Sequence, residues 1–463
     1  MTDHPVTDHP VTEHVVVVGG GLAGASAALY AADAGARVTL LERRTRLGGL
    51  TWSFKRRGLW FDNGQHVFLR CCTAYLAFLR RIGAQDQVAI QPRLDVPVVA
   101  PGGRRASIRR SGLPAPLHMI GSVLGFAHLN IADRLRLVRA AEALRHVDPA
   151  DPALDAITFA AWLAEHGQRP AAIERFWNLV TLPTLNVPAD EASMALAAMV
   201  FRTGLLDTAD GGDIGWSRVP LAELHGANIE MALDQAGVER EFDVRVDAVR
   251  RGPDSSLTVS AGERTWSAPA VVVATSHQTA ADILPPGTLG PVEGLGLSPI
   301  LNVHLVLDRK VTDLGMAACI DSPLQFLFDR TEASGLKSGQ YLAVSISAAD
   351  AYVARRPAEL VSSFHAALGE VFPLARGSEL VDGTVSREPG ATFRGIPGTA
   401  ALRPAASTSI PGLAVAGAWC DTGWPATMEG AVRSGTAAAQ SALGLQGSRS
   451  PIGAPDSPLE HVA

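Results

Sequence analysis

The sequence predicts an α/β protein in which a parallel-sheet domain is interleaved with a mixed α+β domain. An apolar run at 15–18 is followed by a glycine turn, a small-residue helix at 22–34 and a second apolar run at 37–41. Strand signals return after residue 240, beyond a helix-rich middle section. The chain has 463 residues, more than one hydrophobic core usually organises, which favours two domains.

The order of the predicted elements gives the domain division. Further strands are predicted at 241–249, 257–259, 270–274, 300–307 and 341–346, and an apolar segment from 412 leads to a helix that begins near Thr427. We expect the first domain to contain 15–90, 231–290 and 406–444. A helix-rich, substrate- or membrane-facing lobe is expected at 91–230, the sheet of the second domain at 291–405, and disordered tails at 1–14 and 445–463.

Composition narrows the function classes. Apolar residues make up 47% and charged residues 19% of the chain, which is typical of a globular protein. The net charge of −6 and the lack of a long basic run argue against a nucleic-acid partner. The four cysteines have no C-x-x-C spacing, so no metal site is predicted. The first residues lack the apolar segment of a signal peptide, and we expect a cytoplasmic protein.

The glycine turn has the spacing G-x-G-x-x-G. Gly19 permits the tight turn, Gly21 lets the backbone approach a pyrophosphate, and Gly24 allows close helix packing. The N–H groups of the helix N-terminus then hold the anion. Glu42, at the end of the second strand, is placed to accept the hydroxyls of an adenosine ribose, which disfavours a 2′-phosphate. The turn therefore predicts a dinucleotide site.

Three later segments indicate which dinucleotide this site binds. They are R-L-G-G at 46–49, D-N-G-Q-H at 62–66 and the stretch 417–435. Here the chain resembles the amine-oxidase and phytoene-desaturase-like flavoprotein superfamily, which implies FAD as cofactor and a Rossmann-type FAD-binding domain interleaved with the substrate domain. The glycine turn and this resemblance together give the expected FAD-binding residues: Gly19, Gly21, Leu22, Ala23, Gly24, Glu42, Arg43, Arg46, Gly48, Gly49, Leu50, Gly64, Gln65, His66, Val244, Ala274, Gly417, Asp421, Thr427, Met428, Glu429 and Ala431.

Three features of the C-terminal half bear on that set. The resemblance implies that the helix N-terminus around Met428 covers the pyrimidine side of the flavin, where reduced flavin accumulates negative charge. Many relatives carry Gly-Asp where this sequence has Gly417 and Ala418, so Asp421 is the candidate substitute for that aspartate. Val244 is expected to contact the adenine through its backbone.

Within the superfamily, the segments 61–66, 186–193 and 425–435 resemble the hydroxysqualene dehydroxylases. The resemblance implies reduction of hydroxysqualene to squalene, with hydride delivered from reduced flavin to an allylic carbon. We expect His66, assisted by Asp62 or Gln65, to help the hydroxyl leave. The alternative is that Asp62 and His66 cap the turn and hold the flavin. Only one dinucleotide fingerprint is present, so the electron donor is expected to be external.

Three other functions stay open. A carotenoid-type desaturase would run the redox chemistry in the opposite sense on the same fold. An FAD-dependent amine oxidase is a second alternative, and a flavin-bearing isoprenoid carrier without turnover is a third. Product analysis and reoxidation of the bound flavin by polyprenyl substrates would distinguish these possibilities.

One apolar stretch has the composition expected of an access path for an apolar substrate. Leu113 to Leu129 contains no Asp, Glu, Lys or Arg and follows basic residues at 104–110. It is too short and too interrupted by proline to span a bilayer. It predicts either an interfacial segment on the inner face of the cell membrane or the wall of a substrate tunnel.

Overall fold

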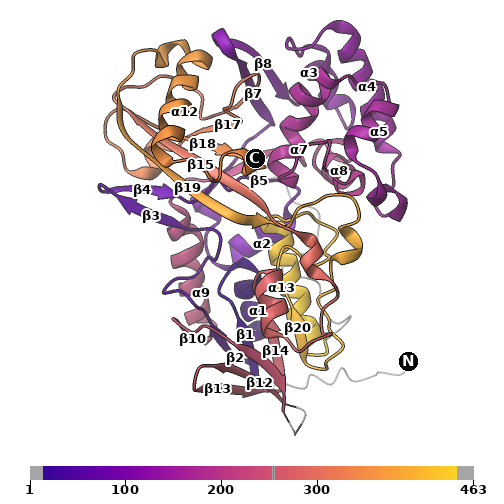
Figure 1. Ribbon diagram of the computed structural model, residues 1–463, viewed down its shortest axis with the longest axis vertical. Coiled ribbons are helices and arrows are strands. Elements are labelled where there is room, and N and C mark those ends of the chain that lie inside the picture. The colour runs from indigo at the N-terminus through magenta and orange to yellow at the C-terminus, as the bar shows by residue number, and fades with distance from the viewer. Residues whose placement is uncertain (1–13, 253, 255, 446–463) are drawn as a thin grey trace, which may run out of the picture.

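The computed structural model describes residues 14–445 except 253 and 255. The tails predicted at 1–14 and 445–463 therefore lie almost entirely outside the described residues. The molecule has a parallel sheet at one end, an antiparallel sheet at the other and a helical lobe beside the latter (Figure 1).

The parallel sheet has five strands in the order β10-β2-β1-β14-β20. The predicted strands near 15–18, 37–41 and 270–274 are confirmed, and the C-terminal strand pairs beside the last of these. The helices α1 (Leu22–Asp33) and α13 (Met428–Ala442) pack against each other along this sheet (Figure 1). In sheet order the strands are Glu239–Glu241, Arg37–Leu41, His14–Val18, Ala270–Val273 and Leu413–Val415.

The strand predicted at 241–249 is wrong in its extent. β10 ends at Glu241, and the next strand, β11, begins only at Ala248. Between them Asp243 has φ +57°. The N–H of Val244 donates to the carbonyl of Glu42 at 3.0 Å. This contact turns the chain out of the sheet and over the end of β2.

The second sheet has seven strands in the order β19-β15-β18-β17-β16-β7-β8, with only the β16–β7 pair parallel. The helix α12 (Pro357–Val371) packs on β15 and β19. Residues 95–109 belong to this sheet and not to the helix-rich lobe predicted for 91–230, because β7 pairs with β16. In sheet order the strands are Leu380–Thr392, Ser298–Leu307, Gln340–Ile346, Phe326–Asp329, Met316–Cys319, Asp95–Ala100 and Arg104–Arg109.

The helical lobe follows β8 and contains the segment 131–145 as the helix α4. Asn130 caps this helix by accepting the N–H of Asp133 at 2.9 Å. The aromatic rings of Phe159, Trp177 and Phe201 pack together in the core of the lobe. The helices are α3 Ile120–Leu124, α4 Ile131–Arg145, α5 Phe159–Glu165, α6 Pro170–Ala172, α7 Asn178–Leu185 and α8 Met194–Phe201, with π-helical turns at Ile173–Trp177 and Arg202–Leu206.

Smaller elements connect the two sheets. The hairpin of β3 and β4 precedes α2. A three-stranded sheet in the order β5-β9-β6 takes β5 from before α2 and its other two strands from after it, and the sheet β11-β12-β13 flanks the parallel sheet. A π-helical turn, η7 (Ala222–Ala227), leads into α9. The remaining bounds are β3 Ser53–Arg56, β4 Leu59–Asp62, β5 Phe68–Leu69, α2 Thr73–Arg81, β6 Val88–Ile90, β9 Ile214–Ser217, α9 Asn228–Gln235, β11 Ala248–Arg251, β12 Leu257–Ala261, β13 Arg264–Ala268, α10 His277–Ile283 and α11 Thr331–Ser334.

Distant parts of the chain meet where α1 crosses α13. The hydroxyl of Ser26 donates to the carbonyl of Val432 at 3.0 Å. A Cβ on Gly435 would lie 2.1 Å from the carbonyl oxygen of Ala23, so the two helices touch through backbone. The N-terminal glycine turn and the beginning of α13 are thereby held at the same end of the parallel strands.

Candidate functional site

The glycine turn after β1 is tightly packed at two of its three glycines. Gly19 has φ +107°, and a Cβ there would lie 2.4 Å from the carbonyl oxygen of Ala274. A Cβ on Gly24 would lie 1.8 Å from the carbonyl oxygen of Gly19, so only glycine lets α1 approach the turn this closely. A Cβ on Gly21 would meet only the Cα of Gly49, at 3.7 Å. Gly21 therefore lies opposite the segment that the resemblance assigns to the phosphate and ribityl region.

Glu42 ties the end of β2 to the glycine turn. Its carboxylate accepts the N–H of Gly20 at 2.6 Å through Oε2 and the N–H of Arg44 at 2.9 Å through Oε1. A carboxylate has about four lone-pair positions, so acceptor capacity is left for ribose hydroxyls. The N–H of Val244 is occupied by the carbonyl of Glu42, which leaves the Val244 carbonyl as its backbone group for an adenine.

Two arginines brace the Gly48–Gly49 turn. Arg44 Nη1 and Arg46 Nη1 each donate to the carbonyl of Gly49 at 3.2 Å. Burial, followed by the positive charge of Arg44, lowers the pKa of Arg46 to about 10. Arg43, which was predicted to contact the cofactor, is exposed, whereas the unpredicted Arg44 lines a cavity. This cavity of about 600 Å³ is lined by Arg44, Thr45, Arg46, Trp52, Asp243, Arg387 and Glu388.

Asp62 is buried and fully engaged. Its Oδ1 accepts hydrogen bonds from the hydroxyl of Ser53 at 2.6 Å and from the N–H of Leu221 at 3.0 Å. Its Oδ2 accepts from Arg330 Nη2 at 2.8 Å, in an ion pair that is almost completely buried. These contacts hold the β3–β4 hairpin against the segments that precede η7 and α11. The structural role left open for Asp62 accounts for every one of them.

The next residues of the D-N-G-Q-H segment lie close to Asp62 and Glu388. Asn63 Nδ2 donates to Glu388 Oε1 at 2.8 Å. Burial lowers the pKa of His66, although the charges of Asp62 and Glu388 act in the opposite direction. His66 is therefore a neutral imidazole near pH 7, able to donate one hydrogen bond. Gln65 Nε2 is buried and has no partner in the part of the chain that the structure describes.

One side chain, that of Thr427, caps the N-terminus of α13. Thr427 Oγ1 accepts the N–H of Gly430 at 3.2 Å. The Glu429 carboxylate points away to α2, where it accepts the N–H groups of Ala74 at 3.1 Å and Tyr75 at 2.7 Å. Glu429 thus caps α2 with its side chain, and only its backbone is left for the flavin contact predicted for it.

The backbone at this helix start has donors to spare. The N–H of Ala431 bonds to the carbonyl of Thr427. Within residues 14–445, apart from 253 and 255, no hydrogen bond uses the N–H of Met428 or Glu429. These two groups carry the positive partial charge of a helix N-terminus, which suits an electron-rich carbonyl oxygen.

Asp421, the candidate substitute for the aspartate of the Gly-Asp pair, has a local contact in this structure. Asp421 is exposed, and its Oδ1 accepts the N–H of Gly423 at 3.1 Å, which closes a local turn. The N–H of Gly417 donates to the hydroxyl of Ser434 at 2.9 Å, so this segment is fastened to α13. A Cβ on Gly417 would lie 2.2 Å from Trp419 Nε1. The assignment of Asp421 to the cofactor stays a prediction.

Several buried polar atoms near these segments lack partners in the described structure. Asn302 donates through Nδ2 to the carbonyl of Asn63 at 3.0 Å, and its Oδ1 is left without a donor. Buried groups without hydrogen bonds are costly, so this set indicates a polar ligand with both donors and acceptors. FAD fits that description. The atoms are Gln65 Nε2, His225 Nδ1, Asn302 Oδ1, Arg387 Nε and Thr422 Oγ1.

A family model described as flavin containing amine oxidoreductase matches residues 22–443 of the chain. The chain belongs to this family. Two hydroxysqualene dehydroxylases are similar over nearly their whole length. That of Zymomonas mobilis is 26% identical, over 92% of this chain and 98% of its own. That of Rhodopseudomonas palustris is 28% identical, over 93% and 98%. The zeta-carotene desaturase of Arabidopsis thaliana is 23% identical, over 93% and 85%.

Solved structures of flavin oxidases share the fold. The cyclohexylamine oxidase of Brevibacterium oxydans aligns with a TM-score of 0.68 and 22% identity, over 94% of this chain and 100% of its own. A putrescine oxidase variant aligns with a TM-score of 0.70 and 18% identity, over 94% and 99%. The predicted amine-oxidase-like fold is confirmed. The protein is an FAD-dependent oxidoreductase.

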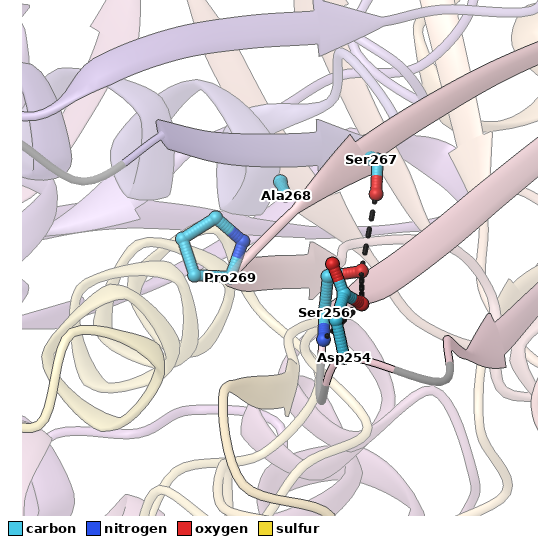
Figure 2. A pocket seen from close by; sticks show the side chains of 5 residues that line it. All are labelled: Asp254, Ser256, Ser267, Ala268 and Pro269. Atoms are coloured by element: carbon cyan, nitrogen blue, oxygen red, sulfur yellow. Dashed lines mark hydrogen bonds between the residues drawn. The ribbon is translucent and has the colours of Figure 1, made fainter.

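The other potential sites of this flavin oxidoreductase give little indication of function. Among residues 14–445, with 253 and 255 left out, no three His, Cys, Asp or Glu side chains are arranged to hold a metal ion. No helix of the same residues is long and apolar enough to cross a membrane. A second cavity, with a volume of about 310 Å³, lies at the edge of the β12–β13 sheet, and Figure 2 shows the side chains that line it. Ser256 there bonds to Asp254 and Ser267, and no predicted site residue lines it.

Proposed function

We propose that this flavoenzyme reductively dehydroxylates hydroxysqualene to squalene. The proposal is carried by the two hydroxysqualene dehydroxylases, which align with almost all of this chain and with 98% of their own length. In the reaction the substrate gains hydride at its allylic carbon and loses its hydroxyl, which leaves with a proton as water. Reduced FAD in its FADH2 form, when bound, would supply both the hydride and the proton that completes the water. An external donor, a nicotinamide or a partner reductase, would reduce the flavin again.

The residues that would hold FAD are those predicted from the sequence, with three refinements from the contacts above. Arg44 replaces Arg43 as the arginine beside the cavity. Glu429 acts through its backbone N–H, because its carboxylate caps α2. Asn302 and Gln65 offer unmatched polar atoms next to the D-N-G-Q-H segment. The glycine turn would bind the pyrophosphate and Glu42 the ribose.

His66 is the proposed donor to the leaving hydroxyl. As a neutral imidazole it would hydrogen-bond the departing oxygen and, unlike an imidazolium, would not pass a full proton early in the step. Gln65, with its unmatched Nε2, is better placed to assist than Asp62, whose oxygens are already bonded. The competing role, in which His66 only supports the flavin, predicts weaker FAD binding and an unchanged chemical step.

A single-turnover experiment separates these roles. The enzyme is reduced under anaerobic conditions and mixed with hydroxysqualene, and flavin oxidation is followed by absorbance. His66→Ala is expected to slow this oxidation roughly 100-fold, as for loss of one positioned hydrogen-bond donor to the transition state, while His66→Gln keeps a donor and recovers part of the rate. His146→Ala, at an exposed histidine, is the control. An unchanged rate for His66→Ala would remove His66 from the chemistry.

Product analysis tests the reaction itself. The reduced enzyme should convert hydroxysqualene into squalene and leave phytoene unchanged. A desaturase, which the similarity to zeta-carotene desaturases keeps as the second candidate, would leave hydroxysqualene untouched and reduce its flavin with a polyene precursor. Turnover of primary amines would instead support an amine oxidase. Failure of every polyprenyl substrate to change the flavin would favour a carrier.

The lobe offers a surface for drawing such a substrate from a membrane. The predicted interfacial segment is exposed over η3 (Leu117–Met119) and α3, and α4 extends the apolar surface. Exposed arginines on the neighbouring strand β8 would suit anionic lipid head groups. We include peripheral membrane attachment in the proposal on these grounds. The exposed fractions are Leu113 49%, Leu117 50%, Ile120 36%, Leu124 42%, Ile131 72% and Leu135 52%.

A further inference from the structure

His225 is a buried histidine with one nitrogen unmatched. It lies in η7, and its side chain is fully excluded from solvent. Its Nε2 lies 2.8 Å from the hydroxyl of Tyr75 on α2, whereas Nδ1 has no partner in the described structure. Sequence reasoning did not select it, because the surrounding LAELHGAN has the pattern of an ordinary helix.

The position of His225 links two segments proposed to bind the cofactor. A Cβ on Gly48, in the turn braced by Arg44 and Arg46, would lie 3.7 Å from the Cβ of His225. His66 is near enough that its positive form would lower the pKa of His225. His225 is therefore close both to the Gly48–Gly49 turn and to the histidine proposed to assist the reaction.

The protonation of the pair follows from its burial. Burial lowers the pKa of His225 to about 3, so the imidazole is neutral. Burial also raises the pKa of Tyr75 above its ordinary value, so the phenol keeps its proton. Tyr75 can then donate to Nε2 of His225, which puts the imidazole hydrogen on Nδ1. A buried N–H without an acceptor is rare in proteins, and a bound ligand is one way to supply the acceptor.

We propose that Nδ1–H of His225 donates a hydrogen bond to bound FAD and that Tyr75 holds the imidazole in the tautomer and orientation for this contact. His225 is then a cofactor-binding residue and Tyr75 a positioning residue. The inference rests on the flavin site of the proposed function and is independent of the substrate. A missing dehydroxylation would therefore leave it intact.

Two conservative substitutions distinguish this role from a structural one. The amide of asparagine can reproduce the Nδ1 group of a histidine, whereas the longer glutamine reproduces Nε2. His225→Asn would keep a donor toward the cofactor and lose the Tyr75 contact. His225→Gln would keep the Tyr75 contact and lose the donor. The measurements are the dissociation constant of FAD from apo-protein and the reduction potential of the bound flavin, neither of which needs turnover.

The proposal predicts that His225→Gln and His225→Leu weaken FAD binding roughly tenfold, as for loss of one hydrogen bond, and shift the flavin potential. His225→Asn should bind FAD within about threefold of the wild type. The reverse order, with Gln restoring affinity and Asn not, would overturn the proposal, because it would show that only the Tyr75 contact matters. Equal affinity for all three variants would overturn it as well.

Two further variants serve as controls for the comparison of the His225 variants. His118 is also buried with an unmatched Nδ1, but it lies in the lobe beside Arg110, so His118→Leu should leave the FAD dissociation constant unchanged. Tyr75→Phe should weaken FAD binding by less than His225→Gln, since it frees the tautomer without removing the donor. Tyr75→Phe binding FAD as tightly as the wild type would contradict the positioning role of Tyr75.

Discussion

The described residues include two buried histidine–tyrosine pairs, of which one has both histidine nitrogens matched and the other does not. In the seven-stranded sheet, His304 Nδ1 lies 2.7 Å from the hydroxyl of Tyr341, and its Nε2 lies 3.0 Å from the hydroxyl of Ser386. Beside the parallel-sheet domain, His225 makes the same kind of bond to Tyr75, but its second nitrogen has no partner in the described structure.

The difference separates a structural polar group from a binding one. Burial lowers the pKa of both histidines to about 3, so the two imidazoles are equally neutral. Where the group serves packing alone, as at His304, both nitrogens are matched by side chains of the same sheet. Where a ligand is to be held, one nitrogen is left for it. Hydrogen-bond matching is therefore more informative here than burial or pKa.

The two pairs are joined by the buried ion pair of Asp62 and Arg330. The N–H of Arg330 donates to the carbonyl of Tyr341, and Asp62 accepts the N–H of Leu221 just before η7. Removing Arg330 would leave the Asp62 carboxylate buried without a counter-ion. Arg330→Met is expected to lower the free energy of unfolding by about 3–5 kcal/mol, the largest effect predicted here.

Urea denaturation of apo-protein measures this loss. The control is Arg309→Met, which breaks an exposed ion pair with Asp308 and should cost less than about 1 kcal/mol. A cost for Arg330→Met no larger than that of the control would mean that the two pairs are not linked through Asp62.

The proposed ligand of the unmatched His225 nitrogen is FAD bound at the glycine turn. Gly24→Ala would place a Cβ against the carbonyl of Gly19, which forces α1 away from the turn. We expect a rise of up to about 100-fold in the FAD dissociation constant, from an overpacking cost of 1–3 kcal/mol. Gly315→Ala, at a glycine with no neighbour within 4 Å, is the control. Unchanged FAD affinity in Gly24→Ala would place the pyrophosphate elsewhere.

The neutral histidines make stability depend on pH. A histidine whose folded pKa is depressed binds its proton more readily in the unfolded chain, so its contribution is complete above pH 6.5 and declines as the pH falls. Between pH 6.5 and 5, His225 and His304 should each lower the stability of apo-protein by about 1–2 kcal/mol. His304→Gln, although less stable at pH 7, should show a shallower pH dependence in chemical denaturation. An equally steep dependence would contradict the neutral state of His304.

The smallest predicted effect concerns the lobe, outside both pairs. Leu117→Glu and Leu124→Glu should each reduce binding to anionic vesicles roughly tenfold in a flotation assay, since each leucine would no longer be buried in lipid. Leu374→Glu, at a leucine that is 70% exposed near α12, should not. Flotation that is insensitive to all three substitutions would favour the tunnel-wall alternative for residues 113–129.

The parts of the fold that were predictable are local in sequence. The strands, glycine turn and helix at 15–41 follow from hydrophobic runs and from the glycine spacing, in which Gly24 packs against the carbonyl of Gly19, five residues away. The pairing of β7 with β16 was missed because it joins segments more than 200 residues apart, and no pattern in 95–109 identifies that partner.

The same limit applies to the site. Glu42 could be selected because its place at the end of β2 fixes its direction. Choosing Arg44 over Arg43 needed the path of a loop, which periodicity does not give. His225 could not be selected from the sequence, because its proposed role rests on contacts with Tyr75 and the Gly48 turn, both of which are far away in the sequence.

The most direct test is the anaerobic addition of hydroxysqualene to the reduced holoenzyme, with the flavin absorbance followed against the amount of squalene formed. One flavin oxidised and one squalene produced for each bound FAD is the expected result. A flavin that stays reduced while hydroxysqualene is recovered intact would contradict the proposed function.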